Sequence, residues 1–147
     1  MRKFELVAEG FRKHADARLP LRATAAACAY DFFAPEDVTI PPMRLVRIWT
    51  DVKASFAKNE VLVINVRSSM GAQPVMLANT QGWIDSDYYS NPDNDGNIGI
   101  TLFNLGETPY DIRKGQRIAQ GMFLSYLTAE NCNSEAAREG GHGSTGK

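Results

Sequence analysis

Gly82-Trp83-Ile84-Asp85-Ser86-Asp87-Tyr88 places two carboxylates and a tyrosine at the end of a short apolar segment. The apolar run Pro74-Val75-Met76-Leu77 precedes it, and the polar residues between the two runs indicate a turn. We therefore expect a strand, a turn and a second strand, which form a platform that holds an acid better than a free loop does. Taken alone, the stretch also fits an ordinary acidic hairpin.

Short segments rich in β-branched and aromatic residues recur along the chain, separated by turn signals. Residues 98–102 alternate apolar with polar or small side chains, as in a half-buried strand. The nearly continuous apolar run 61–66 predicts a strand covered on both faces, and 117–123 predicts another strand. A short helix is possible at 69–73 or within residues 1–14. The pattern predicts an all-β barrel or jelly-roll-like sandwich.

The composition fits one globular domain with a core. The chain has 147 residues, of which 44% are hydrophobic and 22% charged, and its formal net charge is −1. No large basic field exists for nonspecific nucleic-acid binding, although a few placed arginines can still hold an anionic ligand. We find no signal peptide and no apolar run of membrane-spanning length, so we expect a cytoplasmic protein without a membrane partner.

The two cysteines carry little information. Cys28 and Cys132 lie far apart and form neither a zinc-binding pattern nor a disulfide framework. Cys28 lies in an apolar run and is expected to be buried. A reducing compartment fits this cysteine usage best.

The last twenty residues change in character. From Thr128 onward the side chains are mostly small or polar, and the segment 138–147 is rich in glycine. Glycine permits close backbone approach and exposes amide donors, which suits a phosphate ligand, while a disordered end is the simpler interpretation. Residues 141–147 fit most of the GxxxxGK pattern, but no strand directly precedes them and no helix can follow, so we reject a P-loop.

Five short blocks follow one another in order: residues 29–34, 67–69, 79–88, 115–120 and 138–146. They include the sequences GWIDSDY, RIAQ and GGHGSTG. Their order and spacing resemble the five motifs of the trimeric dUTP diphosphatases (dUTPases), bacterial or phage type, from about residue 20 to the C-terminus. The resemblance implies a distorted jelly-roll-like β-barrel at 1–127 and a flexible arm at 128–147.

The resemblance also implies a reaction and an assembly. The family hydrolyses dUTP to dUMP and pyrophosphate by attack of water on the α-phosphorus, which keeps uracil out of DNA. Its homotrimer has sites at subunit interfaces: one chain supplies the phosphate-binding blocks, a second supplies Asp85 and Tyr88, and a third supplies the arm.

Roles in catalysis carry over to three positions. Asp85 matches the base that activates the water, and such a group contributes about 10²–10⁴-fold in rate. Gln120 would orient the same water and contact phosphate. Asp31 would act in the outer coordination sphere of Mg²⁺ through metal-bound water, since this ion keeps several waters and is bound mainly by phosphates.

Substrate-binding roles carry over to the remaining motif positions. Tyr88 would pack on the deoxyribose and leave no room for a 2′-hydroxyl, while Asn79 and the backbone after Tyr88 would read the uracil edge. His142 stands where the family usually has a stacking phenylalanine, and its flat ring can still stack. The resemblance assigns phosphate binding to Arg67, Ser68, Ser69, Arg138, Gly143, Ser144 and Thr145.

Several residues have a structural interpretation that we prefer. Asp87 would cap or charge the turn, Arg117 would pair with a surface carboxylate, and Tyr30, Phe32 and Phe33 would belong to the core. The chain departs from the family pattern at Ala29 and at Tyr89-Ser90, and the inserted residues 91–96 resemble the longer hairpin of some bacterial and phage members.

Two alternatives stay open at this point. The first is a dCTP deaminase or bifunctional deaminase-diphosphatase on the same fold, which ammonia release from dCTP would reveal. The second is a nucleotide-sensing or repressor-binding module, as some phage-encoded relatives are thought to be. A regulatory protein partner would point to this second alternative.

Overall fold

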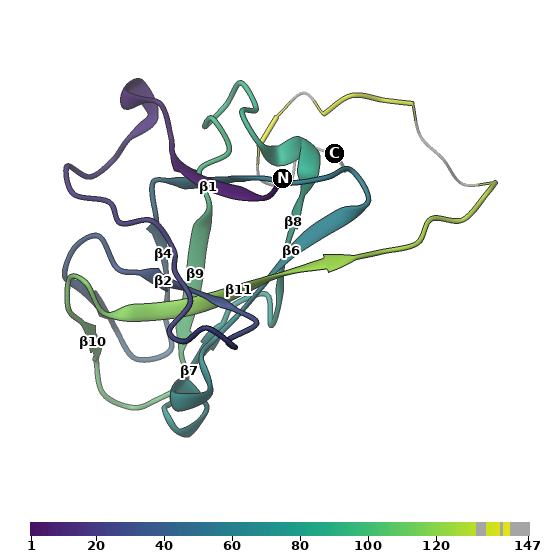
Figure 1. The fold of residues 1–147 in the computed structure, drawn as a ribbon. Coiled ribbons are helices and arrows are strands. Elements are labelled where there is room, and N and C mark those ends of the chain that lie inside the picture. The colour runs from purple at the N-terminus through teal and green to yellow at the C-terminus, as the bar shows by residue number, and fades with distance from the viewer. Residues whose placement is uncertain (132–134, 139, 142–147) are drawn as a thin grey trace.

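The computed structural model describes residues 1–131, 135–138 and 140–141. It confirms the predicted all-β class (Figure 1). The strands are β1 Lys3–Leu6, β2 Tyr30–Phe33, β3 Val38–Ile40, β4 Leu45–Trp49, β5 Val52–Ser55, β6 Glu60–Asn65, β7 Val75–Leu77, β8 Gly82–Asp85, β9 Gly99–Asn104, β10 Tyr110–Ile112 and β11 Arg117–Ser125. Three short 3₁₀ helices complete the described elements: η1 Glu9–Phe11, η2 Ser68–Ala72 and η3 Ser86–Tyr88.

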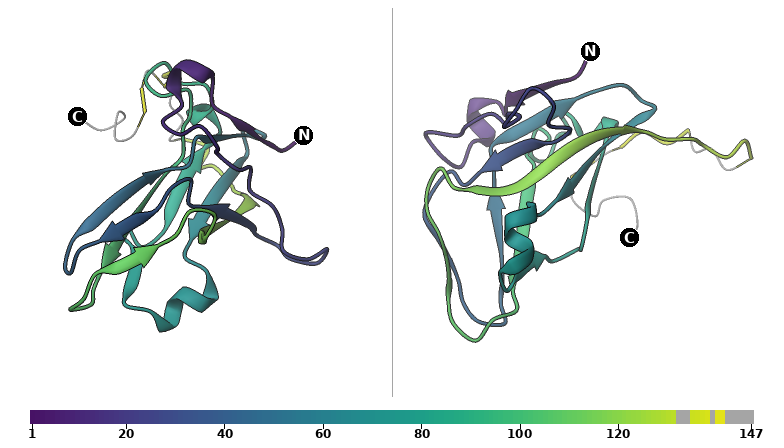
Figure 2. Two further views of the ribbon diagram at one scale, coloured as in Figure 1. Left: turned by 90° about the vertical axis from the view of Figure 1, so that its left-hand side faces the viewer. Right: turned by 60° about the horizontal axis from the view of Figure 1, so that its bottom comes forward.

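The strands form two main antiparallel sheets. One has the order β2-β11-β6-β8 and the other the order β4-β9-β7, with the smaller pairs β1-β5 and β10-β3 beside them. Figure 2 shows these layers curving around a common interior, as in a jelly roll. The long strand β11 pairs with both β2 and β6 and joins the two halves of the larger sheet.

Alternation along the strands builds the core between the sheets. In β9, Ile100 and Leu102 are buried while their neighbours are partly exposed, as the sequence predicted. Leu62 and Ile64 of β6 face them from the other sheet and belong to the same buried cluster. Each fully buried side chain of this kind stabilises the fold by about 1.5–3 kcal/mol. β6 is buried from Glu60 to Ile64, which confirms the prediction of a strand covered on both faces.

An aromatic cluster fixes β1 on the larger sheet. The ring of Phe4 lies 5.2 Å from that of Tyr30, 5.7 Å from that of Phe32 and 5.5 Å from that of Phe123. The first two contacts are edge-to-face and the third is tilted, and such ring contacts stabilise beyond the area that the rings bury. Phe32 and Phe33 are buried and Tyr30 is half-buried, so their predicted core role is confirmed.

The prediction that Cys28 is buried is wrong. Cys28 is exposed in the long connection between β1 and β2. The alanines that precede Cys28 are small, so burying them would remove little apolar area from water. The hydrophobic effect therefore gives this segment little tendency to be buried.

Strands β7 and β8 follow one another along the chain but do not pair. β7 pairs with β9, whereas β8 pairs with β6, so the turn between them crosses from one sheet to the other. Thr80 in this turn has a φ of 63°. The crossing leaves the free edge of β8 facing the start of β9, and a pocket opens between these two edges.

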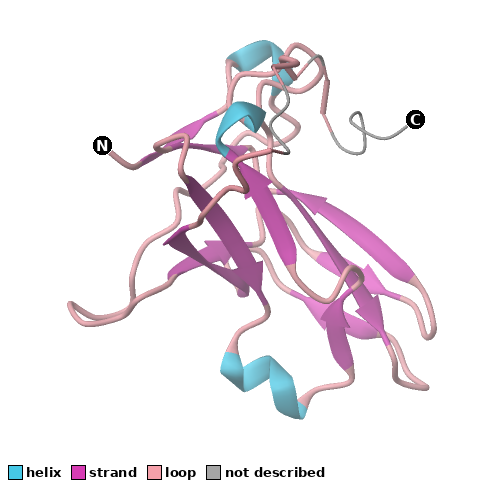
Figure 3. Ribbon diagram, turned by 90° about the vertical axis from the view of Figure 1, so that its right-hand side faces the viewer, coloured by secondary structure: helices cyan, strands magenta, loops and turns pink. Residues whose placement is uncertain are grey.

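The 3₁₀ helices mark the two ends of the molecule. Figure 3 shows η2 at the end opposite to η1 and η3. The helix predicted at 69–73 therefore exists as η2, beginning at Ser68, and the first fourteen residues hold β1 and η1. Within the described residues no helix is long and apolar enough to cross a membrane.

Candidate active site

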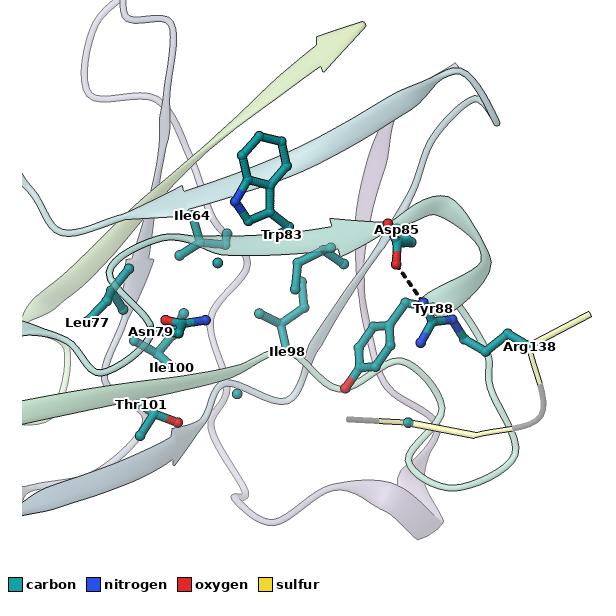
Figure 4. Close-up of a pocket in the computed structure, with 14 residues that line it drawn as sticks. Ile64, Leu77, Asn79, Trp83, Asp85, Tyr88, Ile98, Ile100, Thr101 and Arg138 are labelled. Atoms are coloured by element: carbon teal, nitrogen blue, oxygen red, sulfur yellow. Dashed lines mark hydrogen bonds and ion pairs between the residues drawn. The ribbon is translucent and has the colours of Figure 1, made fainter. Parts of the chain in front are cut away.

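The pocket between β8 and β9 has a volume of about 250 Å³. Apolar side chains from both sheets form its interior, and polar groups lie at its rim (Figure 4). Small-ligand pockets are commonly of this kind, apolar with a few placed polar groups. The lining residues are Ile64, Leu77, Asn79, Gly82, Trp83, Ile84, Asp85, Tyr88, Ile98, Gly99, Ile100, Thr101, Arg138 and Gly141.

Two strand edges face each other across this pocket. Among the strands of the described residues, β8 pairs with β6 alone, and the β7 pairing of β9 stops at Leu102, so within that part of the chain the Gly99 and Ile100 backbone is paired only on the β4 side. Backbone N–H and C=O groups on such edges are strong donors and acceptors that need partners. The backbone along these two edges can therefore hydrogen-bond to the edge of a flat polar ring.

Close packing explains why Gly82 begins β8. A Cβ added at Gly82 would lie 3.1 Å from the Cβ of Ile64 on the paired strand. A larger residue here would push β8 away from β6 and disturb the pocket wall, because a packed core resists added volume.

Tyr88 is fixed at the end of the pocket. Its side chain is 5% exposed, its hydroxyl donates to the Asn97 carbonyl at 2.8 Å, and Asn94 Nδ2 donates to that hydroxyl at 2.8 Å. Burial raises the pKa of the Tyr88 phenol above its ordinary value, although the Asn94 hydrogen bond opposes this effect. The phenol is therefore neutral near pH 7, and its ring has one defined position.

Asp85 ends β8 at the same side of the pocket and is 62% exposed. Arg138 Nη2 lies 2.6 Å from Asp85 Oδ2, and Arg138 Nε lies 2.8 Å from Asp87 Oδ1. The same guanidinium lies 5.8 Å from the centre of the Tyr88 ring. One arginine thus bridges both carboxylates of the motif.

A second group of motif residues lies at the other end of the larger sheet. Asp31 is 5% exposed, and Arg67 Nε contacts its Oδ1 at 2.8 Å. Arg117 Nε lies 3.4 Å from Asp31 Oδ2, so Arg117 pairs with a buried carboxylate and the predicted surface partner is wrong. Asp31 lies on the edge strand β2, between Gln120 of β11 on one side and an isolated bridge to Leu21 on the other.

Gln120 and the serines complete this second group. Gln120 stands opposite both Asp31 and Asn65, and its Nε2 donates to the Val66 carbonyl at 3.3 Å. Ser68 and Ser69 are exposed in η2, where Arg67 Nη1 donates to Ser69 Oγ at 3.4 Å.

The two groups are too far apart to meet within one chain. Asp85 pairs with Val61, and Arg67 follows Val61 by six residues along an extended segment. At roughly 3.3 Å per residue, Arg67 and Asp85 are about 20 Å apart. Of the predicted residues, the chain therefore brings Asp85, Tyr88, Asn79 and Arg138 to one pocket, and places Asp31, Arg67, Ser68, Ser69 and Gln120 elsewhere. His142, Gly143, Ser144 and Thr145 lie outside the described residues.

The described residues form no cluster of three His, Cys, Asp or Glu side chains that could hold a metal ion. The Asp31 carboxylate is already paired with two arginines, which makes it a poor direct ligand. It can still accept a hydrogen bond from a water on a metal that phosphates hold, which is the way Mg²⁺ usually binds beside nucleotides.

Sequence reasoning missed Asp93. Its Oδ2 accepts the backbone N–H of Gly141 at 2.8 Å, in the inserted turn after Tyr88. The insertion itself was the one available signal, because no pattern of residue types connects a carboxylate with a backbone amide 48 positions away.

The fold is that of a jelly-roll-like protein with a pocket between two strand edges. The dUTPase family model matches residues 15–146, and the chain belongs to the dUTPase family. The deoxyuridine 5′-triphosphate nucleotidohydrolase of Lactococcus lactis is 37% identical, over 99% of this chain and 98% of that protein. The enzyme of the same name from Wolinella succinogenes is 34% identical, over 91% of this chain and 90% of that protein.

Solved structures agree with this assignment. The dUTPase of Streptococcus mutans superposes with a TM-score of 0.79 at 35% identity, covering 87% of this chain and 98% of that chain. A dUTPase from Staphylococcus bacteriophage 80alpha has the same fold, with a TM-score of 0.74 at 24% identity, covering 92% of this chain and 89% of that chain.

Proposed function

We propose that this chain is a dUTP diphosphatase that hydrolyses dUTP to dUMP and pyrophosphate. The observation that carries this function is the position of Asp85 and Tyr88 at the rim of a pocket between two free strand edges. Relatives named deoxyuridine 5′-triphosphate nucleotidohydrolase, at 34–37% identity over nearly the whole chain, support the same function.

In this proposal the pocket selects a deoxyuridine. The uracil lies between β8 and β9, where Asn79 and the backbone of Gly99 and Ile100 offer donors and acceptors to its edge. The sugar packs on the Tyr88 ring, which is held by Asn94 and Asn97 and cannot withdraw to admit a 2′-hydroxyl. A buried, fixed ring discriminates against a bulkier sugar by steric exclusion.

Asp85 then acts as the base. It takes a proton from a water as the water oxygen bonds to the α-phosphorus, and the bond from this phosphorus to the bridging oxygen breaks to release pyrophosphate. A positioned base of this kind contributes about 10²–10⁴-fold in rate. Arg138 pairs with Asp85 of its own chain, and the planar fork of an arginine can bind phosphate oxygens as it binds a carboxylate.

The second group of residues requires a second chain. Because Arg67 lies about 20 Å from Asp85, with Asp31 paired to it and Gln120 opposite Asp31, we propose that a neighbouring subunit brings these three residues to the α-phosphate in a homotrimer. Gln120 orients the water there, and Arg67 with Ser68 and Ser69 holds the phosphates. The arm 128–147 of a third subunit would close the site, with Arg138, Gly143, Ser144 and Thr145 on the outer phosphates and His142 over the base.

Exposed apolar side chains support such an assembly. Trp83 on β8 is 61% exposed and projects away from the pocket (Figure 4), and Leu124 on β11 is 41% exposed. Leu127, just beyond β11, is 98% exposed. Large apolar groups left in water at one sheet commonly mark an interaction surface.

We propose Mg²⁺ as the cofactor. The substrate phosphates would hold it, with Asp31 accepting a hydrogen bond from its water, and it would neutralise phosphate charge during the reaction. A cytoplasmic location, the absence of nucleic-acid binding and a regulatory protein partner stay predictions.

Pyrophosphate release from dUTP, dCTP, dTTP and UTP, measured with and without Mg²⁺, tests the function. We expect rapid release from dUTP in magnesium and release at least tenfold slower from the other three nucleotides, because the excluded methyl of dTTP, the excluded hydroxyl of UTP or the reversed donor-acceptor pattern of the dCTP base each costs about 1.4 kcal/mol or more. Intact dUTP under these conditions would refute the proposal, and ammonia release from dCTP would indicate a deaminase instead.

A further inference from the structure

A buried carboxylate that the proposed reaction does not use lies at the corner between β4 and β5. Asp51 is fully buried, and its Oδ2 accepts the backbone N–H groups of Lys13 at 2.8 Å and His14 at 2.7 Å. Its Oδ1 accepts a hydrogen bond from Asn97 Nδ2 at 2.8 Å, and its own backbone N–H donates to Asn97 Oδ1 at 3.0 Å. A buried charge is costly unless hydrogen bonds compensate it, so these bonds fix Asp51 against Asn97 and the N-terminal segment.

Asn97 leads directly into one edge of the pocket. Ile98, the next residue, lines the pocket, and β9 begins immediately after it. The Ile98 N–H donates to the Val52 carbonyl at 2.9 Å, and the Ile98 carbonyl accepts the Thr50 N–H at 3.1 Å and the Thr50 hydroxyl at 2.8 Å. The corner 50–52 therefore sets where β9 starts along the pocket.

The backbone of this corner has a conformation that needs support. Asp51 has a φ of 56°, in the left-handed region that residues other than glycine seldom adopt. At this point the chain leaves β4, which pairs with β9, and enters β5, which pairs with β1. Loss of the side-chain bonds of Asp51 would therefore allow the corner, and with it the start of β9, to shift.

We propose that Asp51 is a positioning residue, which acts through Asn97 to hold the start of β9 where its backbone meets the base of the nucleotide. The proposal rests on the proposed dUTP hydrolysis and adds to it a determinant of base selectivity behind the pocket wall. A displaced edge would present its N–H and C=O groups less well to uracil, and so would distinguish uracil from cytosine less sharply. Selection against a 2′-hydroxyl depends on the Tyr88 ring and should change little.

A reciprocal exchange of the two side chains tests this role. Asp51→Asn sets an amide donor against other donors, and Asn97→Asp sets two carboxylates against each other, whereas the combined variant restores the hydrogen bonds because donor and acceptor have changed places. We measure pyrophosphate release and expect each single variant to lower the ratio of kcat/KM for dUTP over dCTP roughly three- to tenfold, as for loss of one hydrogen bond. The combined variant should recover the wild-type ratio, and the ratio for dUTP over UTP should stay within about twofold in all three.

Asn104→Asp is the matched control, since it makes the same change at the other end of β9. Asn104 is fully buried, and its Nδ2 donates to the Ile40 carbonyl at 2.9 Å and to the Thr108 carbonyl at 2.8 Å, so a carboxylate there also weakens the fold. A weaker fold lowers activity on every nucleotide alike, so the ratio for dUTP over dCTP should equal that of the wild type. A wild-type ratio in Asp51→Asn, an equal fall in Asn104→Asp, or no recovery in the combined variant would overturn the proposal.

Hydrogen exchange of the wild type, with and without dUMP, gives a readout that needs neither a variant nor turnover. If the Asp51 contact favours nucleotide binding, then by linkage the bound nucleotide strengthens that contact. We therefore expect several-fold slower exchange of the Lys13 and His14 amides with dUMP bound, although both donate to Asp51 and not to the pocket. Unchanged exchange at saturating dUMP would contradict the role of Asp51. If the wild type leaves dUTP intact, the proposed hydrolysis fails, while exchange with dUMP still tests the coupling.

Discussion

At the scale of the residue, Tyr88 combines a place in the pocket wall with a buried, hydrogen-bonded hydroxyl. Its ring forms a wall of the pocket, and its hydroxyl is hydrogen-bonded on both sides by Asn94 and Asn97. The sequence predicted a sugar-packing ring from the family resemblance. It could not show the two hydrogen bonds, because Asn94 lies in the inserted turn and Asn97 lies directly after it.

Tyr88→Phe separates the contribution of the hydroxyl to stability from the proposed contribution of the ring to nucleotide selectivity. The variant keeps the ring but leaves the Asn97 carbonyl and the Asn94 amide without their partner, so unfolding should become easier by about 1–3 kcal/mol. The preference for dUTP over UTP should persist. Denaturant unfolding and the ratio of kcat/KM for the two nucleotides check both statements, and an unchanged free energy of unfolding would contradict the first.

At the scale of the element, the strands were predictable and their partners were not. The alternation in 98–102 and the apolar run 61–66 predicted β9 and β6, since these patterns arise within each strand. The separation of β7 from β8 depends on contacts with β9 and β6 that are remote along the chain. For the same reason the site residues were predicted through the family resemblance, while their division into two groups required the structure.

The inserted turn makes the stability of the fold depend on pH. Asp95 contacts Lys53 at 2.8 Å and accepts the Ala8 N–H at 2.7 Å. Burial acts to raise the pKa of Asp95, but the lysine and the N–H together hold it below its ordinary value. The stabilisation is therefore present above the unfolded-state pKa of about 3.9 and is lost as the pH falls through the lower folded-state pKa.

Asp95→Asn tests this linkage. The variant should be less stable than the wild type near pH 7, and the difference should shrink as the pH falls below about 4, because protonation removes the same charge from the wild type. Thermal midpoints between pH 7 and pH 3 measure it. A difference that stays constant over this range would assign the effect to packing and not to charge.

At the scale of the whole molecule, the pocket of one chain lacks Arg67, Ser68, Ser69 and Gln120, which we propose to act at the phosphates. The larger sheet keeps Arg67 and Asp85 at opposite ends, and no rearrangement of side chains spans about 20 Å. The exposed Trp83 and Leu127 indicate where further chains would make contact. The composition could not reveal these contact surfaces, because which apolar residues are exposed is known only once the fold is known.

Mixed trimers test the sharing of sites. Asp85→Asn and Arg67→Ala should each be nearly inactive, and subunit exchange between equal amounts should restore about a quarter of the sites, since each of the two contributing chains is the suitable variant half of the time. Steady-state turnover before and after exchange measures the recovery. No recovery, despite mass-spectrometric evidence of mixed trimers, would place each complete site within one chain.

Hydrolysis of dUTP in ¹⁸O-labelled water, by the wild type and by Asp85→Asn, tests the central claim that Asp85 activates a water for attack on the α-phosphorus. We predict that the label enters dUMP and not pyrophosphate, and that the variant binds the nucleotide but turns it over about 10²–10⁴-fold more slowly. Label in pyrophosphate, or wild-type turnover by Asp85→Asn, would contradict the account.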